Sequence, residues 1–235
     1  DFTGAGLYAR SQIEAHTRFL TNNVFGNPHS SNPTSQSMTD LVEKARQSVL
    51  EFVKADPQEY VCVFTQNASG ALKLIGESFP FQSGSQYLLT YDNHNSVNGI
   101  REFARAHGAK ITYIPIALPE MRINADELEC QLNSRDNSYN NLFAYPAQSN
   151  FSGVQHSLSW IQKAQEAGWT VLLDVAAFLP TNPLDLSRYH PDFVVCSFYK
   201  IFGYPTGVGA LIARREALGK LKRPWFAGGT ITVAS

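Results

Sequence analysis

The sequence has little cysteine, and its cysteines are not arranged as a metal site. Cys62, Cys130 and Cys196 are three in number and widely spaced, and no Cys-x-x-Cys pair is present. An odd, scattered set of this kind indicates neither a zinc site nor a redox motif. We therefore expect a reducing, cytoplasmic setting and no bound metal.

Long apolar runs and basic runs are also missing. The most apolar stretch, residues 171–180, contains Asp174 and is far shorter than the roughly 20 residues that cross a bilayer. The 19 basic and 20 acidic residues give a formal net charge of −1, and no basic run could follow a phosphate backbone. We expect neither a membrane span nor a nucleic-acid partner.

The chain has 235 residues, 43% of them hydrophobic, and is long enough to bury a substantial core. Helical spacing of apolar residues predicts a long amphipathic helix over residues 34–54. After it, short apolar runs alternate with helical patterns, which predicts right-handed crossovers and a parallel sheet with helices on both faces. The predicted strands are 60–65, 86–90, 110–114, 141–145, 170–173 and 192–197, with a last, antiparallel strand at 209–213; the predicted helices are 68–79, 97–107, 125–132 and 157–167. The simplest division is an N-terminal segment, 1–33, and one α/β domain, 34–235.

Polar turns follow several of these strands, at the edge of the sheet where α/β proteins bind ligands. Residues 66–70 lead from the first strand into a helix, and a hydroxyl-bearing turn at a helix N-terminus suits a phosphate. Ser69 in this turn is either a phosphate ligand or a plain N-cap. His94 follows the next strand; it could stack on an aromatic cofactor ring, although a lone loop histidine is more often a surface or capping residue.

Three further segments end strands of the predicted sheet. Residues 148–153 by themselves read as an ordinary turn. Asp174 ends an apolar strand, so its carboxylate must be paired, hydrogen-bonded or protonated; a pyridinium N–H would suit it, and an arginine or a backbone cap is the structural alternative. Lys200 lies between an apolar strand and a glycine/proline turn, where desolvation would make its amine nucleophilic. Taken alone, Lys200 would be interpreted as a surface lysine. Together with the polar turns, His94 and Asp174, which all follow strands, it predicts one shared pocket.

The sequence resembles the class V aminotransferase-like group of fold-type I enzymes that use pyridoxal 5′-phosphate (PLP), a group that includes the cysteine desulfurases. Within it, four runs look most like the aminotransferase-like domain of the molybdenum cofactor sulfurases. The resemblance covers nearly the whole chain, and the lysine segment is its most specific part. The four runs are Gly26-Asn27-Pro28-His29-Ser30, Ala71-Leu72-Lys73-Leu74, residues 197–207 around Lys200, and Phe226-Ala227-Gly228-Gly229-Thr230.

The resemblance implies a PLP cofactor and a role for each matching residue. Lys200 would form the Schiff base and then move the substrate Cα proton. Asp174 would keep the pyridine nitrogen protonated, and His94 would stack on the ring. Asn150 would hydrogen-bond the phenolic oxygen. The remaining cofactor-binding positions are Ala68, Ser69, Gly70 and Ser197 at the phosphate, Tyr199 beside the lysine, and Thr230, which would reach the phosphate of the neighbouring subunit in a homodimer.

Two departures from the desulfurase pattern indicate the sulfurase-like branch: Tyr199 and Ala177 stand where many desulfurases have His and Gln. The family continues past this sequence into a small C-terminal domain, so we expect that domain to be absent from this chain. None of the three cysteines matches the family's sulfur-accepting Cys.

The function implied is that of a PLP-dependent cysteine desulfurase or sulfurtransferase, acting on L-cysteine and passing sulfur to an unidentified acceptor, with molybdenum cofactor sulfuration as one use of that sulfur. Two alternatives stay open. One is a class V aminotransferase, epimerase or lyase acting on another amino acid. The other is a PLP-binding fragment without turnover.

Overall fold

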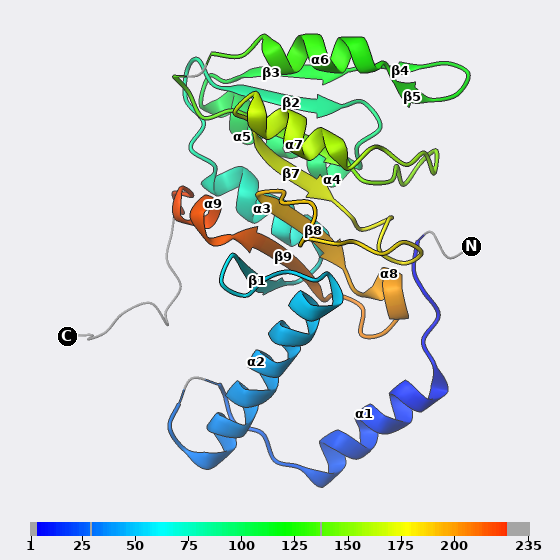
Figure 1. Cartoon of the computed structure of the whole chain (residues 1–235). Helices are drawn as coiled ribbons and strands as arrows, with labels where there is room; N and C mark the ends of the chain where they lie inside the picture. Colours follow the sequence, from blue (N-terminus) through cyan, green and yellow to red (C-terminus); the bar gives the residue numbers. More distant parts are fainter. Residues whose placement is uncertain (1–3, 29, 137, 225–235) are drawn as a thin grey trace, which may run out of the picture.

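A seven-stranded sheet forms the centre of the computed structural model, which describes residues 4–28, 30–136 and 138–224. The strand order is β1-β9-β8-β7-β6-β2-β3 (Figure 1). Within this sheet β9 runs antiparallel to both of its neighbours, and the other pairings are parallel. The predicted mostly parallel, mixed sheet is therefore confirmed. The strands are β1 (Tyr60–Thr65), β2 (Gln86–Thr90), β3 (Lys110–Ile114), β6 (Leu142–Pro146), β7 (Thr170–Asp174), β8 (Phe193–Ser197) and β9 (Gly209–Arg214).

The helices agree with the sequence pattern, with shifts of a few residues at their ends. The predicted helix 97–107 is divided at Gly99 into α4 (Asn95–Asn98) and α5 (Ile100–Ala106). The other predicted helices are α2 (Pro33–Phe52), α3 (Ala68–Ser78), α6 (Ala125–Asn133) and α7 (Ser159–Glu166). Elements that the pattern did not predict are α1 (Arg10–Asn22), the two-stranded sheet of β4 (Ile116–Ala117) and β5 (Arg122–Ile123), and the short helices α8 (Tyr199–Phe202) and α9 (Arg215–Gly219).

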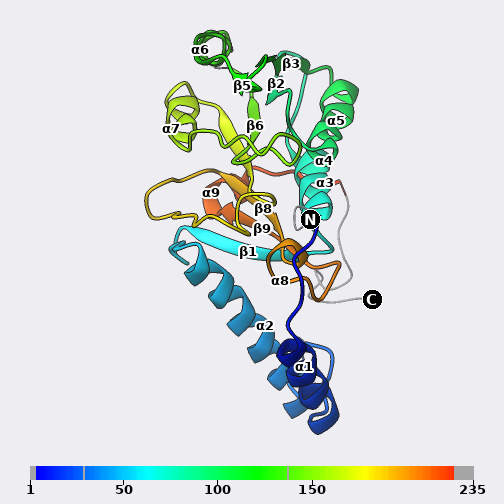
Figure 2. The same cartoon turned by 90° about the vertical axis from the view of Figure 1, so that its right-hand side faces the viewer.

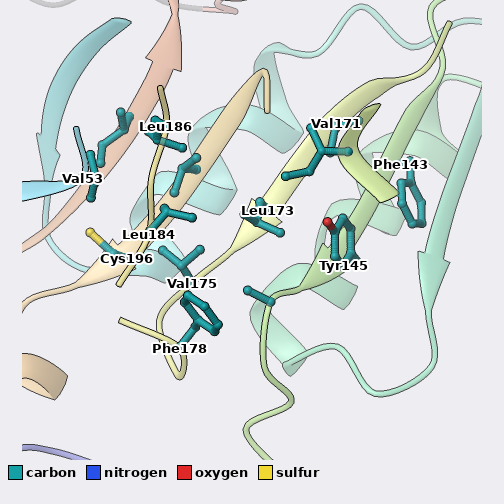
Figure 3. Packing of buried hydrophobic residues seen from close by; sticks show 14 of the residues in the cluster. Val53, Phe143, Tyr145, Val171, Leu173, Val175, Phe178, Leu184, Leu186 and Cys196 are labelled. Atoms are coloured by element: carbon teal, nitrogen blue, oxygen red, sulfur yellow. The ribbon is translucent and has the colours of Figure 1, made fainter. Parts of the chain in front are cut away.

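Helices cover both faces of the sheet and enclose a hydrophobic core on each side. On one face α3, α5 and α9 pack against the strands; on the other lie α6, α7 and the end of α2 (Figure 2). Strand β7 contributes to both cores: Val171 and Leu173 enter the second one (Figure 3), whereas Leu172 enters the first. Since successive side chains of a strand point to opposite faces, a strand covered on both sides must be apolar throughout. This explains the short continuous apolar runs of the sequence.

The first two helices stand away from the sheet (Figures 1 and 2). Helix α1 has no buried residue, and α2 buries only Ser35 and Leu50. Helix α1 was not predicted from the sequence, although its apolar residues recur at helical spacing as clearly as those of α2. The segment before α1 lies against α8, where the Gly6 N–H donates to the Tyr199 carbonyl oxygen at 2.9 Å.

No helix within the described ranges is both long enough and apolar enough to traverse a bilayer.

Candidate active site

Five connections meet at the carboxyl ends of the parallel strands and surround a pocket. They follow β1, β2, β6, β7 and β8, which the topology places side by side or one strand apart. This is the edge at which open α/β sheets bind ligands. Eight of the residues predicted from the sequence line the pocket: Ala68, Ser69, His94, Asn150, Asp174, Ser197, Tyr199 and Lys200.

The first turn of α3 forms one wall of the pocket. The Asn67 side chain accepts a hydrogen bond from the Gly70 N–H at 2.9 Å, so Asn67 is the N-cap and the capping interpretation of Ser69 was wrong. The Ala68 N–H donates to Ser197 Oγ at 2.9 Å, which ties the start of the helix to the end of β8. Gly70 lies in this turn but does not line the pocket.

Ser69, Ser96 and His94 form a chain of contacts beside this turn. The hydroxyl oxygens of Ser69 and Ser96 lie 2.5 Å apart. Ser96 also contacts His94 Nδ1, through its hydroxyl at 3.0 Å and through its backbone N–H at 3.2 Å. Because a backbone N–H can only donate, Nδ1 is the acceptor and a neutral imidazole carries its proton on Nε2. His94 therefore caps α4 and lines the pocket at the same time.

Asp174, at the end of β7, places a buried carboxylate in the pocket. It is 7% exposed, and its Oδ1 accepts a hydrogen bond from the Ala176 N–H at 2.9 Å. Burial raises the pKa of Asp174, while the Ala176 N–H and the nearby His94 and Lys200 act in the opposite direction. Among the described residues no arginine pairs with Asp174, so of the two structural alternatives the backbone contact is the one present.

Lys200 lies in α8, directly after β8, and its amine points across the pocket. The Nζ donates to Asn150 Oδ1 at 2.7 Å. The side chain is half-buried, and this burial lowers the pKa of Lys200, with Asp174 opposing the shift. An amine with a lowered pKa is neutral over more of the pH range, and the neutral form is the nucleophile and the base.

The turn after the lysine is held by the N-terminal segment. Helix α8 ends at Gly203, whose φ is 74°. A Cβ at this position would lie 2.4 Å from the Gly6 carbonyl oxygen and 2.7 Å from the Tyr8 nitrogen. Glycine is therefore required both by the left-handed backbone and by the close approach of the two segments. Through Gly6 and Gly203, the start of the chain fixes the loop that carries Lys200.

Of the ten site residues expected from the sequence, nine lie in the described part, and Thr230 lies outside it. The pocket also contains Asn67, Ser96, Gln148 and Ala177. Ala177 was noted as a departure from the desulfurase pattern, and Asn67 and Gln148 fall in the polar turns 66–70 and 148–153, but no role was predicted for Asn67, Ser96 or Gln148. Asn67 could have been found, because an asparagine directly before a helix is a strong capping signal. Ser96 could not, because its contact with Ser69 joins two turns that are 27 positions apart.

The donor set suits a phosphorylated pyridine aldehyde such as PLP. Within the described residues the Ser69 N–H at the start of α3 makes no hydrogen bond, and Ser69, Ser96 and Ser197 line the same pocket. Free N–H groups and hydroxyls at a helix N-terminus fit a phosphate. Across the pocket, the buried carboxylate of Asp174 matches a ring N–H, and the amine of Lys200 matches an aldehyde.

Three comparisons agree on the relatives of this chain. The family described as aminotransferase class-V matches residues 5–235. Molybdenum cofactor sulfurase of Arabidopsis thaliana is 41% identical over 268 residues, which cover 100% of this chain and 32% of that protein. The human molybdenum cofactor sulfurase is 40% identical over 245 residues, covering 98% of this chain and 27% of that protein. The chain thus spans about a third or less of these relatives.

Solved structures show the same fold. The apo cysteine desulfurase from Thermococcus onnurineus NA1 superposes with a TM-score of 0.87 at 26% identity, over 100% of this chain and 58% of that one. The NifS-like protein from Rickettsia africae has a TM-score of 0.83 at 18% identity, over 98% of this chain and 61% of that one, and shows the fold alone. The predicted fold class, the large domain of a fold-type I enzyme, is confirmed.

Proposed function

The chain belongs to the class-V aminotransferase family, and on this premise we propose that it is the cofactor-binding part of a PLP-dependent enzyme that takes sulfur from L-cysteine and passes it to an acceptor. The premise supplies the cofactor class, because this family and the cysteine desulfurases depend on PLP. Similarity to the molybdenum cofactor sulfurases and to a cysteine desulfurase supports the choice of sulfur chemistry.

The proposed cofactor contacts follow from the position of each group in the pocket. Ser69, Ser197 and the N-terminus of α3, including Ala68 and Gly70, would hold the phosphate. His94 would lie against the ring, and Asp174 would accept the ring N–H. When bound, PLP supplies an electron sink for the electrons of the bond broken at the substrate Cα. Tyr199 lines the pocket next to Lys200, and Thr230 would act across a homodimer interface.

The chemistry of this chain's own residues centres on Lys200. Burial lowers the pKa of its amine, which favours the neutral form that takes a proton from the substrate Cα and returns it. Asn150 accepts a hydrogen bond from this amine and limits the directions in which it can point. Asp174 lies in a buried position where a carboxylate gains from a cationic partner, because the charged form is otherwise penalised by burial.

One observation carries the proposal: a half-buried lysine, a buried carboxylate, an imidazole and a helix N-terminus with hydroxyls line one pocket. None of these groups is specific alone. Their combination matches one small molecule: the lysine matches an aldehyde, the carboxylate a ring nitrogen, the imidazole the face of the ring and the helix N-terminus a phosphate.

The cysteines bear on the sulfur step. Burial raises the pKa of Cys62 to about 11 and that of Cys196 to about 12, so both are poor thiolates. The exposed Cys130 does not line the pocket. A cysteine that receives sulfur would therefore be a residue other than these three. The alternative is a reaction without sulfur transfer, as in an aminotransferase, epimerase or lyase. The cytoplasmic location expected from the free cysteines stays a prediction.

The test is product formation from L-cysteine by the PLP-loaded protein in the presence of a thiol. Equal amounts of sulfide and alanine support the proposed function, and Lys200→Ala is the matched control that should form neither. Release of pyruvate, or amino transfer to an added 2-oxo acid without sulfide, would favour the alternative. Loss of both reactions while PLP remains bound would indicate a binding domain without turnover.

A further inference from the structure

A buried histidine–aspartate pair, neither member of which lines the pocket, has no role in the proposed chemistry. His156 Nε2 and Asp92 Oδ2 are 2.8 Å apart, and each side chain is 2% exposed. The two residues are 64 positions apart in the chain. Asp92 follows β2, and His156 lies in the loop between β6 and α7.

The contacts around the pair fasten these two loops together. The His156 N–H donates to the Ala147 carbonyl oxygen at 3.0 Å, and its ring stacks on Trp160 with centroids 5.1 Å apart. On the other side, the Asp92 carbonyl oxygen accepts a hydrogen bond from Ser149 Oγ at 3.3 Å. Stacking on Trp160 fixes the plane of the imidazole, and the hydrogen bond to Ala147 fixes the backbone of His156. The loop after β2 contacts this imidazole through Asp92.

Each loop carries a residue of the proposed cofactor site. His94 is two residues after Asp92, and Asn150 directly follows Ser149. Ser149 Oγ also lies 3.3 Å from the N–H groups of Phe151 and Ser152, so it organises the turn that presents Asn150 to Lys200. The distance between His94 and Asn150 across the pocket therefore depends on the pair.

The pair is an unusual way to join two loops. Asp92 Oδ1 is buried and has no hydrogen-bond partner among the described residues. Apolar side chains of similar volume hold elements together as well as a buried ion pair does, without leaving a carboxylate oxygen unsatisfied. What a charge-assisted hydrogen bond adds is direction, since it fixes both distance and angle.

We propose that Asp92 and His156 are positioning residues, which set the spacing of His94 and Asn150 so that both contact the same cofactor. This inference rests on the proposed function, because it assumes that PLP binds between these two residues. It assigns the pair no contact with the cofactor.

The test uses purified protein with three variants. His156→Phe keeps an aromatic ring that can stack on Trp160 but removes the ring nitrogen that contacts Asp92. His156→Gln restores a side-chain donor. Tyr60→Phe is the control: it removes the buried hydrogen bond from Tyr60 OH to the Pro191 carbonyl oxygen, 3.1 Å long, and Tyr60 does not line the pocket. The readouts are the Kd for PLP, the visible circular dichroism of the bound cofactor at saturation, and the Tm of the cofactor-free protein.

We expect His156→Phe to raise the Kd for PLP about tenfold and to weaken the visible dichroism, because the cofactor loses its fixed orientation. His156→Gln should recover most of both, and Tyr60→Phe should lower the Tm only. The proposal is overturned if His156→Phe lowers the Tm but keeps the dichroism band and a Kd within about twofold of the unsubstituted protein.

A fourth variant, Asp92→Asn, covers the case in which His156→Phe does not fold. Asp92→Asn keeps the shape of the carboxylate and leaves no buried charge behind. It should raise the Kd about threefold, because a neutral hydrogen bond replaces a charge-assisted one; an unchanged Kd and dichroism band would overturn the proposal equally. Failure of the unsubstituted protein to bind PLP would instead contradict the proposed function, and this outcome is distinct from a failure of the positioning proposal.

Discussion

Lys200 Nζ and Asn150 Oδ1 lie 2.7 Å apart although 50 positions separate them in the chain. The contact joins the helical turn after β8 to the loop after β6, across β7. It places the amine on the same side of the pocket as the amide that is proposed to contact the phenolic oxygen of PLP. The aldehyde and the phenolic oxygen are neighbours on that ring, so one pair of residues addresses two adjacent groups.

The first prediction concerns the site of covalent attachment. Borohydride reduction of the PLP-treated protein should place a pyridoxyl group on Lys200, because burial lowers the pKa of this amine and keeps more of it neutral. Peptide mapping identifies the modified residue. The exposed Lys73 on α3 is the internal comparison; a group found there instead would contradict the assignment.

The pH dependence of this labelling has a definite sign. Since the pKa of Lys200 is below the ordinary value for lysine, the yield of reduction at a fixed short time should begin to rise at a lower pH than it does for a lysine in a short unstructured peptide. An equal pH profile for Lys200 and the peptide would show that the pocket does not change the acidity of Lys200.

The second prediction concerns Asp174→Asn. The asparagine oxygen can still accept from the Ala176 N–H, so the fold should persist, but a neutral amide cannot keep a pyridine nitrogen protonated, and turnover should fall by about two orders of magnitude or more. Asp192→Asn is the control: this partly buried carboxylate directly precedes β8 and does not line the pocket, so its substitution should leave turnover unaffected. Near-native turnover of Asp174→Asn would make Asp174 structural.

The stability of the same variant follows from linkage. Because the folded-state pKa of Asp174 is raised, the folded protein binds more protons than the unfolded one between the ordinary pKa and the raised one. This residue therefore makes the free energy of unfolding fall as the pH rises through that window, and the destabilisation is complete above it. Cofactor-free Asp174→Asn should consequently have a higher Tm than the unsubstituted protein at pH 7 and a flatter profile below it. An equal or lower Tm at pH 7 contradicts this.

The third prediction concerns Ser96, which the sequence did not indicate. Ser96→Ala removes the hydroxyl that contacts both Ser69 and His94. Losing one such hydrogen bond costs about 1 kcal/mol, equivalent to a Kd for PLP about fivefold higher. Titration followed by cofactor absorbance measures this. Ser96→Thr keeps the hydroxyl and should restore the affinity; if alanine and threonine behave alike, the hydroxyl is not involved.

The fourth prediction concerns the contact between the N-terminal segment and the lysine loop. Gly203→Ala adds a methyl group that would lie 2.4 Å from the Gly6 carbonyl oxygen, at a φ of 74°. We expect a loss of about 2 kcal/mol in the free energy of unfolding, together with faster proteolysis near residues 4–9.

Gly153→Ala is the matched control for this substitution. Gly153 has the same φ of 74°, but an added Cβ there would have nothing within 4 Å. It therefore carries the cost of the left-handed backbone without the clash. If both variants are cleaved at the same rate near residues 4–9, the close approach of Gly203 to Gly6 does not hold the segment.

Several features follow from the sequence alone. The apolar runs predict the strands because a sheet covered on both faces needs apolar residues at every position, as Val171, Leu172 and Leu173 illustrate. The alternation of strands and helices then predicts the edge of the sheet at which polar residues gather. Asp174 and Lys200 are recognisable because each places a charge next to an apolar strand. A charged residue next to an apolar run is a local pattern, so a single sequence is enough to reveal it.

Contacts between distant segments were decided by the tertiary structure. Nothing in the sequence indicates that Ser96 reaches Ser69 or that His156 pairs with Asp92, because each contact depends on how two turns approach each other. Sequence periodicity indicates which residues are buried against a core. Hydrogen bonds between loops have no such periodicity, so they are recognised only once the fold has brought the loops together.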